Sequence, residues 1–141
     1  MAALPIVVAI LVTLSLLTAA CSGKAEAPGG SAALKVNLKE WRIDLNQGSV
    51  PSGPIDFEIT NGGRIGHEVV VVRSDLPEKA LPSHGGIVDT NTAGQTVRVI
   101  KDVRPGRRVH QSLDLPPGKY VLICNIVGHY QLGMVAALEA R

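Results

Sequence analysis

Apolar and polar residues alternate along most of the chain from residue 34 onward. Alternation with a period of two is typical of strands that bury one face. In residues 34–38 and 41–45 every second residue is apolar, and the buried face changes near Glu40. This pattern predicts two strand segments with a bulge or bend between them. Residues 55–60 alternate as clearly and predict another strand.

A run of valines follows His67-Glu68 in residues 67–72, which predicts an interior strand covered on both faces. Prolines and glycines break residues 73–95 repeatedly, so we expect a loop there, with at most one helical turn at residues 78–81. Further strands are predicted at residues 97–100, 109–115, 119–124 and 134–139. About eight short strands and almost no helix predict an all-β fold, a Greek-key β-sandwich or barrel.

The N-terminal residues 1–20 carry no charge, are mostly apolar and end in small residues just before Cys21. This segment resembles a bacterial lipoprotein signal, so we predict a signal over residues 1–21 and lipidation at Cys21. It lacks the Lys or Arg of a usual secretory signal, and about 20 apolar residues can also span a bilayer. An uncleaved membrane anchor and ordinary cleaved secretion therefore stay open. All three place the domain outside the cytoplasm, on the periplasmic or cell-surface side.

Residues 22–33 are rich in Gly, Pro, Ser and Ala and have no periodic apolar face, which predicts a flexible linker. The remaining residues, 34–141, form one domain of common size. Hydrophobic residues make up 45% of the chain but aromatic residues only 3%, so aliphatic side chains must build the core. The net charge of +2 is too weak to indicate a nucleic-acid partner. No glycine-rich phosphate-binding motif occurs, and we expect a monomer.

The chain has two cysteines, Cys21 and Cys124. A disulfide between them is the simplest alternative, but a lipidated or removed Cys21 leaves Cys124 alone. A single thiol in an oxidising compartment is prone to reaction unless something occupies it. A bound metal ion would do so.

Cys124, His129 and Met134 follow one another with the spacing C-x4-H-x4-M. Five residues turn a helix by about 500°, which leaves such neighbours about 140° out of register. In a strand, an odd separation points side chains to opposite faces. A tight loop can bring the three together, and Gly128 and Gly133 give the backbone freedom that it needs.

His67 adds a second imidazole from far upstream. Two imidazoles, a thiolate and a weak thioether are the ligand set of a blue-copper electron-transfer site. Taken singly, these residues have ordinary explanations: a structural histidine, a buried thiol and a core methionine. A Cys/His nucleophilic pair would lack a third orienting residue here, and a thioether is a poor ligand for zinc.

The run Tyr120-x3-Cys124-x4-His129-x4-Met134, preceded by Pro-Gly and joined to an upstream Gly-His-Glu, resembles the cupredoxins. Its spacing is most similar to that of rusticyanin, sulfocyanin and the small plastocyanin- and azurin-like copper proteins. The resemblance covers roughly residues 34–139 and implies a Greek-key sandwich of about eight strands with one type 1 copper ion. It also implies His67, Cys124 and His129 as in-plane ligands and Met134 as the axial ligand. Tyr120 resembles the tyrosine that packs at the corner before the cysteine strand.

Glu68 and Asn125 are predicted to lie just outside the ligands. Several relatives carry Asn after the first histidine, where it steadies the loop around the sulfur, so Glu68 is a departure that leaves the reduction potential open. An apolar rim around His129 would suit brief docking of a redox partner such as a cytochrome or an oxidase. The same side chains could instead simply cap the core. The rim residues are Ile126, Val127, Tyr130 and Leu132.

Two further histidines, His84 and His110, are expected at the surface, with an auxiliary copper site as the alternative. The basic residues between Lys101 and Arg108 are typical of a solvated turn. They could also steer an acidic partner.

These patterns together predict an exported copper protein, attached to a membrane through a lipid or anchor, that carries one electron at a time between Cu(II) and Cu(I). It is not expected to be an enzyme. A single cysteine near the histidines excludes a dinuclear copper centre, and a single domain excludes a self-contained multicopper oxidase. The same ligands would serve a periplasmic copper-binding protein for resistance, sequestration or delivery. A copper-free binding module is the third alternative.

Overall fold

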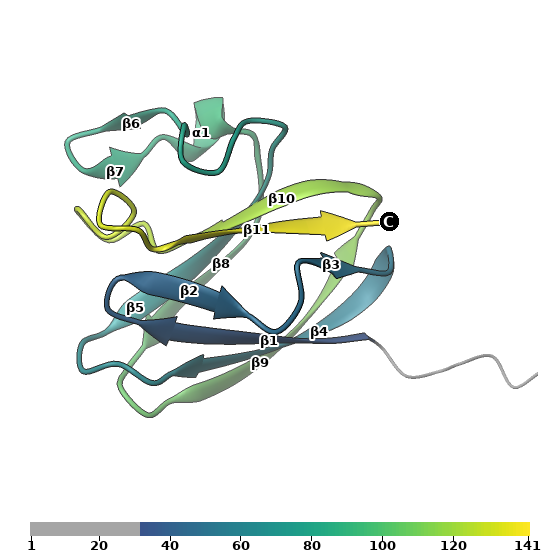
Figure 1. The fold of residues 1–141 in the computed structure, drawn as a ribbon, viewed down its shortest axis with the longest axis horizontal. Coiled ribbons are helices and arrows are strands. Elements are labelled where there is room, and N and C mark those ends of the chain that lie inside the picture. The colour runs from purple at the N-terminus through teal and green to yellow at the C-terminus, as the bar shows by residue number, and fades with distance from the viewer. Residues whose placement is uncertain (1–31) are drawn as a thin grey trace, which may run out of the picture.

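Two β-sheets form the domain in the computed structural model, which describes residues 32–141. The strand order is β2-β1-β4-β9 in the first sheet and β3-β11-β10-β5-β8 in the second (Figure 1). The first sheet consists of β1 (Ala32–Lys39), β2 (Arg42–Leu45), β4 (Gly53–Asn61) and β9 (Arg108–Leu115). The second consists of β3 (Ser49–Val50), β5 (His67–Arg73), β8 (Gln95–Val103), β10 (Gly118–Ile123) and β11 (Val135–Ala140). The hairpin of β6 (Ser83–His84) and β7 (Ile87–Val88) and the helix α1 (Thr90–Ala93) lie between β5 and β8 in the chain.

The predicted all-β class is confirmed, with eleven strands in residues 32–141 rather than about eight. The three additional strands, β3, β6 and β7, have two residues each, which is too short for an alternating pattern to show. At residues 78–81 there is no helix; the Ala80 N–H donates to the Pro77 carbonyl oxygen (2.9 Å) and closes a single turn. The helix in the described residues is α1, where the Asp89 side chain caps the first turn by accepting from the Asn91 N–H.

The change of buried face at Glu40 marks a reversal of the chain. Lys39 faces Arg42 in the antiparallel pairing of β1 with β2, so Glu40 and Trp41 connect the two strands. β1 also pairs in parallel with β4 as far as Asn61. The β1–β2 turn therefore lies at the same end of the sandwich as the end of β4 and the start of β5.

Hydrophobic side chains form two clusters on opposite faces of the second sheet. The valines of β5 divide between them, since Val69 and Val71 belong to one cluster and Val70 and Val72 to the other. This confirms the prediction of an interior strand. The inner core, between the sheets, contains Leu34, Val36, Leu38, Ile43, Val50, Ile55, Phe57, Ile59, Val69, Val71, Ile100, Val103, Leu113, Leu115, Tyr120, Leu122, Cys124, Met134, Leu138 and Ala140. The outer cluster contains Val70, Val72, Leu81, Val88, Ala93, Val121, Ile123 and Tyr130.

All four predicted metal ligands lie at one end of the sandwich. The β1–β2 turn, the start of β5, the β8–β9 connection and the β10–β11 loop meet at this end (left in Figure 1). β1 begins at the opposite end with Ala32, two residues before the predicted domain start. No helix in residues 32–141 is long and apolar enough to cross a membrane. The predicted signal, Cys21 and most of the predicted linker lie outside the described residues.

Candidate metal centre

Three of the predicted ligands lie in the loop between β10 and β11. Cys124 directly follows β10, and Met134 directly precedes β11. The Cys124 N–H donates to the Met134 carbonyl oxygen, and the Met134 N–H donates to that of His129, each at 3.1 Å. Gly128 and Gly133 have φ values of +82° and +114°, at which other residues are strained. The tight loop predicted from the ligand spacing is therefore present.

Two neighbouring turns hold this loop from outside. The Gly128 N–H donates to the carbonyl oxygen of Gly86 in the β6–β7 turn (2.8 Å). A Cβ atom at Gly133 would lie 2.9 Å from the carbonyl oxygen of Trp41, so the β1–β2 turn leaves no room for a side chain there. Backbone contacts thus fix the loop on both sides.

His67 joins the loop from the first residue of β5. Its Nδ1 lies 3.3 Å from Nδ1 of His129 and 3.9 Å from Sγ of Cys124, and Nδ1 of His129 lies 3.3 Å from the same sulfur. The three donor atoms all lie within 4.8 Å of one another, and all three residues are buried. Within residues 32–141 no other group of three His, Cys, Asp or Glu side chains gathers in this way.

Met134 is fully buried in the inner core together with Cys124. Its backbone is hydrogen-bonded to both Cys124 and His129. The backbone of Met134 is therefore fixed beside the backbones of two of the other three predicted ligands.

Opposing effects act on the pKa of the Cys124 thiol. Burial raises its pKa, because a thiolate is poorly solvated in the core. The backbone N–H groups of Glu68 and Ile126 lower the pKa, and the Glu68 N–H donates to Sγ at 3.4 Å. A cation stabilises a thiolate far more than these two groups do. The site therefore suits a metal-bound sulfur better than a free nucleophile.

The imidazole of His67 is held in its neutral form. Burial lowers the pKa of His67, nearby His129 lowers it further, and Glu40 opposes both. Its side chain has no exposed surface, and its Nε2 has no hydrogen-bond partner in the described chain. Neutral imidazole is the form that binds a metal ion.

Sequence reasoning missed two residues of the β1–β2 turn. The ring of Trp41 packs edge-on against His129, with ring centroids 5.2 Å apart. Oε1 of Glu40 accepts hydrogen bonds from the N–H groups of Arg64 and Ile65. These N–H groups lower the pKa of Glu40 to about 2, so the carboxylate stays charged. The change of buried face at Glu40 was the only signal of this turn in the sequence.

Glu68 and Asn125 both lie next to the ligands, but they act differently. Glu68 reaches the sulfur through its backbone N–H and not through its carboxylate. The Asn125 side chain accepts from the Val88 N–H (2.7 Å) and donates to the Val88 carbonyl oxygen (3.0 Å). It thus ties the residue after Cys124 to β7.

Three of the four predicted rim residues are exposed beside the loop. They are Ile126 (36%), Val127 (64%) and Leu132 (56%). The prediction that Tyr130 belongs to this exposed rim is wrong, because Tyr130 is buried in the outer cluster. Its hydroxyl accepts from the Leu81 N–H (3.0 Å) and donates to the Glu78 carbonyl oxygen (2.9 Å). The tight turns of the loop send the side chain that follows His129 back towards the sheet.

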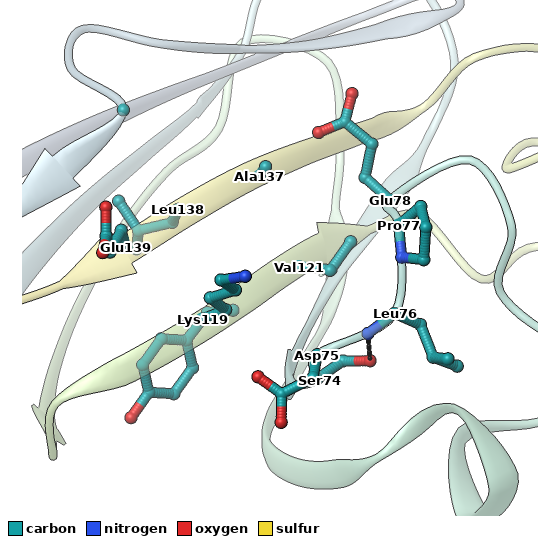
Figure 2. A pocket seen from close by; sticks show the side chains of 12 residues that line it. Ser74, Asp75, Leu76, Pro77, Glu78, Lys119, Val121, Ala137, Leu138 and Glu139 are labelled. Carbon is teal, nitrogen blue, oxygen red and sulfur yellow. Dashed lines mark hydrogen bonds between the residues drawn. The ribbon is translucent and has the colours of Figure 1, made fainter.

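The remaining polar groups do not form a second site. His84 and His110 are exposed, as predicted, and neither is part of a metal-binding cluster of described residues. A hollow of about 460 Å³ lies beside β10 and β11, away from the ligands. Its carboxylates, from Asp75, Glu78 and Glu139, lie well apart in Figure 2. They therefore cannot share one cation.

The donor atoms of the centre fit copper. Two imidazole nitrogens and a thiol sulfur that face one another in the buried interior form a ligand set that a cation can bind. Copper also accepts a thioether ligand, whereas zinc binds a thioether only poorly. A two-sheet β-sandwich with this centre in the loops at one end defines a cupredoxin. Cupredoxins bind one copper ion, act as electron carriers and not as enzymes, and are generally extracytoplasmic.

The comparison with protein families gives the particular family. The sulfocyanin (SoxE) domain matches residues 47–140, more than half of the chain. The chain belongs to the sulfocyanin family. No curated protein matches it.

Solved cupredoxin structures share the fold. The auracyanin of Roseiflexus castenholzii is 21% identical, with 80% of this chain and 99% of the auracyanin covered and a TM-score of 0.59. The rusticyanin of Thiobacillus ferrooxidans is 15% identical, with 80% and 79% covered and a TM-score of 0.60. The azurin of Methylomonas sp. strain J is 15% identical, with 79% and 99% covered and a TM-score of 0.56.

Proposed function

We propose that this protein is an exported one-electron carrier that its N-terminal segment tethers to a membrane. The observation that carries this proposal is the buried convergence of His67, Cys124 and His129 in a region that contains Met134. Bound copper supplies the Cu(II)/Cu(I) couple, which stores and releases one electron. His67, Cys124 and His129 would hold the metal, and Met134 would be the weak fourth ligand.

The chain keeps the geometry of these residues constant when the charge of the centre changes. The Cys124–Met134 and Gly128–Gly86 hydrogen bonds are made by the backbone and do not involve the metal. The Glu68 N–H donates to the sulfur and stabilises its negative charge. Fast electron transfer requires little rearrangement, and this scaffold provides it.

The His129 side of the centre is the docking side for a redox protein, such as a cytochrome or an oxidase. His129 is 8% exposed, which makes it the most exposed of the four predicted ligands. Ile126, Val127, Leu132 and Trp41 are exposed near it. A small apolar patch of this kind suits a brief contact better than a permanent one.

The charge beside the centre is balanced. A hollow of about 280 Å³ is lined by Lys101 and Arg104, and also by Glu68 and Asp102. This lining therefore does not favour a partner of either charge.

The direction of the first strand supports the tether. Ala32, where β1 begins, lies at the end of the sandwich opposite the β10–β11 loop (Figure 1). An attachment upstream of Ala32 would therefore not cover the loop and its exposed rim. We propose the signal over residues 1–21 and a lipid on Cys21 as that attachment.

Copper loading of the full-length protein tests the centre. We expect an intense visible band from thiolate-to-Cu(II) charge transfer, which Cys124→Ser abolishes. The matched control, Cys21→Ser, makes the same exchange at the other cysteine and keeps the band. A colourless protein with a tetragonal copper EPR signal would reject the type 1 assignment.

Two further measurements separate the remaining alternatives. Reversible voltammetry and electron exchange with a native cytochrome support a carrier, whereas loss of the metal on reduction supports a role in copper resistance, sequestration or delivery.

Membrane fractionation tests the tether. Release of Cys21→Ser from the membrane supports lipidation, its retention supports an uncleaved anchor, and soluble wild-type protein supports cleaved secretion.

A further inference from the structure

The ring of His67 needs its proton on Nε2. Its Nδ1 faces Sγ of Cys124 and Nδ1 of His129, so Nδ1 is the atom that a metal ion would contact through its lone pair. The proton of the neutral ring then lies on Nε2. This atom is buried and has no hydrogen-bond partner in residues 32–141, which is unfavourable for an N–H group.

Glu40 provides a carboxylate on this side of the ring. Its Oε1 lies 3.7 Å from Nε2 of His67, slightly beyond hydrogen-bond distance. The same oxygen accepts from the N–H groups of Arg64 and Ile65, which precede His67 in the β4–β5 connection. One carboxylate oxygen therefore links the β1–β2 turn to the segment that leads into His67.

The backbone holds Glu40 in this place. A Cβ atom at Gly63 would lie 2.8 Å from Oε2 and even closer to Oε1, so a side chain there would displace the carboxylate. The two N–H donors come from the backbone and not from the imidazole. The backbone therefore holds this carboxylate 3.7 Å from Nε2 without a hydrogen bond from the imidazole.

We propose that Glu40 is the positioning residue for His67: its carboxylate accepts the Nε2 proton and fixes the tautomer that presents Nδ1 to the metal. This inference rests on the proposed metal-binding role of His67. A carboxylate behind a metal-bound imidazole orients the ring and raises its basicity, and loss of such a partner weakens metal binding about 10- to 100-fold. The negative charge also favours Cu(II) over Cu(I) and lowers the reduction potential.

The copper-free, full-length protein gives the most direct test. The ¹⁵N shifts of the His67 ring should report a proton on Nε2 in the wild type. Glu40→Gln should keep this tautomer, because its amide oxygen still accepts, and Glu40→Ala should shift the ring towards a mixture. The ring of His129 serves as the internal reference. An unchanged His67 tautomer in Glu40→Ala overturns the proposal.

The copper-loaded protein gives an independent readout. Copper affinity should fall about 10-fold or more in Glu40→Ala, and the reduction potential should rise in both Glu40 variants. Glu68→Gln is the matched control, because it removes a carboxylate next to His67 that has no hydrogen bond to the imidazole. An equal rise in potential in Glu68→Gln and Glu40→Ala would overturn the proposal, since loss of charge alone would then explain the effect.

The two proposals fail in different ways. Thermal unfolding of the copper-free variants shows whether the β1–β2 turn survives. If Glu40→Ala does not fold, the His67 tautomer in the wild type and in Glu40→Gln carries the test. A wild-type protein that binds no copper rejects the proposed function. A wild type that binds copper with its His67 proton on Nδ1 in the copper-free state rejects the role of Glu40 alone.

Discussion

The inner core and the outer cluster hold the β10–β11 loop from two sides, and they are built differently. Cys124 and Met134 belong to the inner core, which lies between two sheets of long strands. Tyr130 belongs to the outer cluster, which the β6–β7 hairpin, α1 and their connections cover. Extended strands thus fix the two sulfur residues, whereas a few side-chain and backbone hydrogen bonds join the outer cover to the loop.

Three of those hydrogen-bonded contacts join the cover to the loop. Asn125 bonds to Val88, Gly128 bonds to Gly86, and the Tyr130 hydroxyl bonds to Leu81. Each uses a backbone group of the cover. This difference indicates that the sheets position the ligands, whereas the cover keeps the β10–β11 loop packed against the sandwich.

The largest effect is expected from the inner core. Phe57 is fully buried there, and Phe57→Ala should reduce the free energy of unfolding of the copper-free protein by about 3–5 kcal/mol, since it leaves a cavity. Urea titration measures this loss. Val99→Ala, at a position that is 42% exposed, should change the free energy by less than about 0.5 kcal/mol. Equal losses in the two variants would contradict the importance of the inner core.

A neighbouring pair of valines compares the two regions directly. Val71 and Val72 are both fully buried, but Val71 faces the inner core and Val72 the outer cluster. Each change to Ala should cost about 1.5–3 kcal/mol, and Val71→Ala should cost more because the two sheets cannot close around the cavity. Hydrogen exchange should show local opening at Leu81 and Val88 in Val72→Ala only. The same exchange pattern in both variants would remove the distinction between the regions.

The smallest effect comes from removing one hydroxyl. Tyr130→Phe leaves the buried Leu81 N–H without its acceptor and should cost about 1–2 kcal/mol. Tyr120→Phe is the matched control at the far end of the inner core, where the hydroxyl donates to the Pro116 carbonyl oxygen (2.6 Å). Visible and EPR spectra of the copper-loaded proteins should change in Tyr130→Phe alone. A changed spectrum in Tyr120→Phe would mean that the loop responds to changes throughout the inner core and not only to the loss of the Tyr130 hydroxyl.

Sequence patterns predicted the long strands because most of them bury one face or both. The run Val69 to Val72 even predicted cover on both sides, which the two clusters confirm. The segment between β5 and β8 could not be predicted in the same way. Its strands have two residues each, and its folding depends on distant partners such as Tyr130 and Asn125.

The candidate centre was predictable where its residues are close in the chain. The spacing of Cys124, His129 and Met134 required a loop, and the loop is present. Glu40 and Trp41 were not found, because only the pairing of β1 with β2 and β4 brings their turn beside the histidines. Tyr130 was misplaced because alternation does not predict side-chain direction inside a tight loop.

The hydrogen bond from the Cys124 N–H to the Met134 carbonyl oxygen extends the β10–β11 ladder by one rung beyond the strands. The nine residues between them, 125–133, therefore form an insert that begins and ends on the same rung. A longer or shorter insert between the same two residues would leave the register of both strands unchanged. The spacing of the ligands can thus diverge, or be redesigned as an exchangeable cassette, while the sandwich that carries it stays the same.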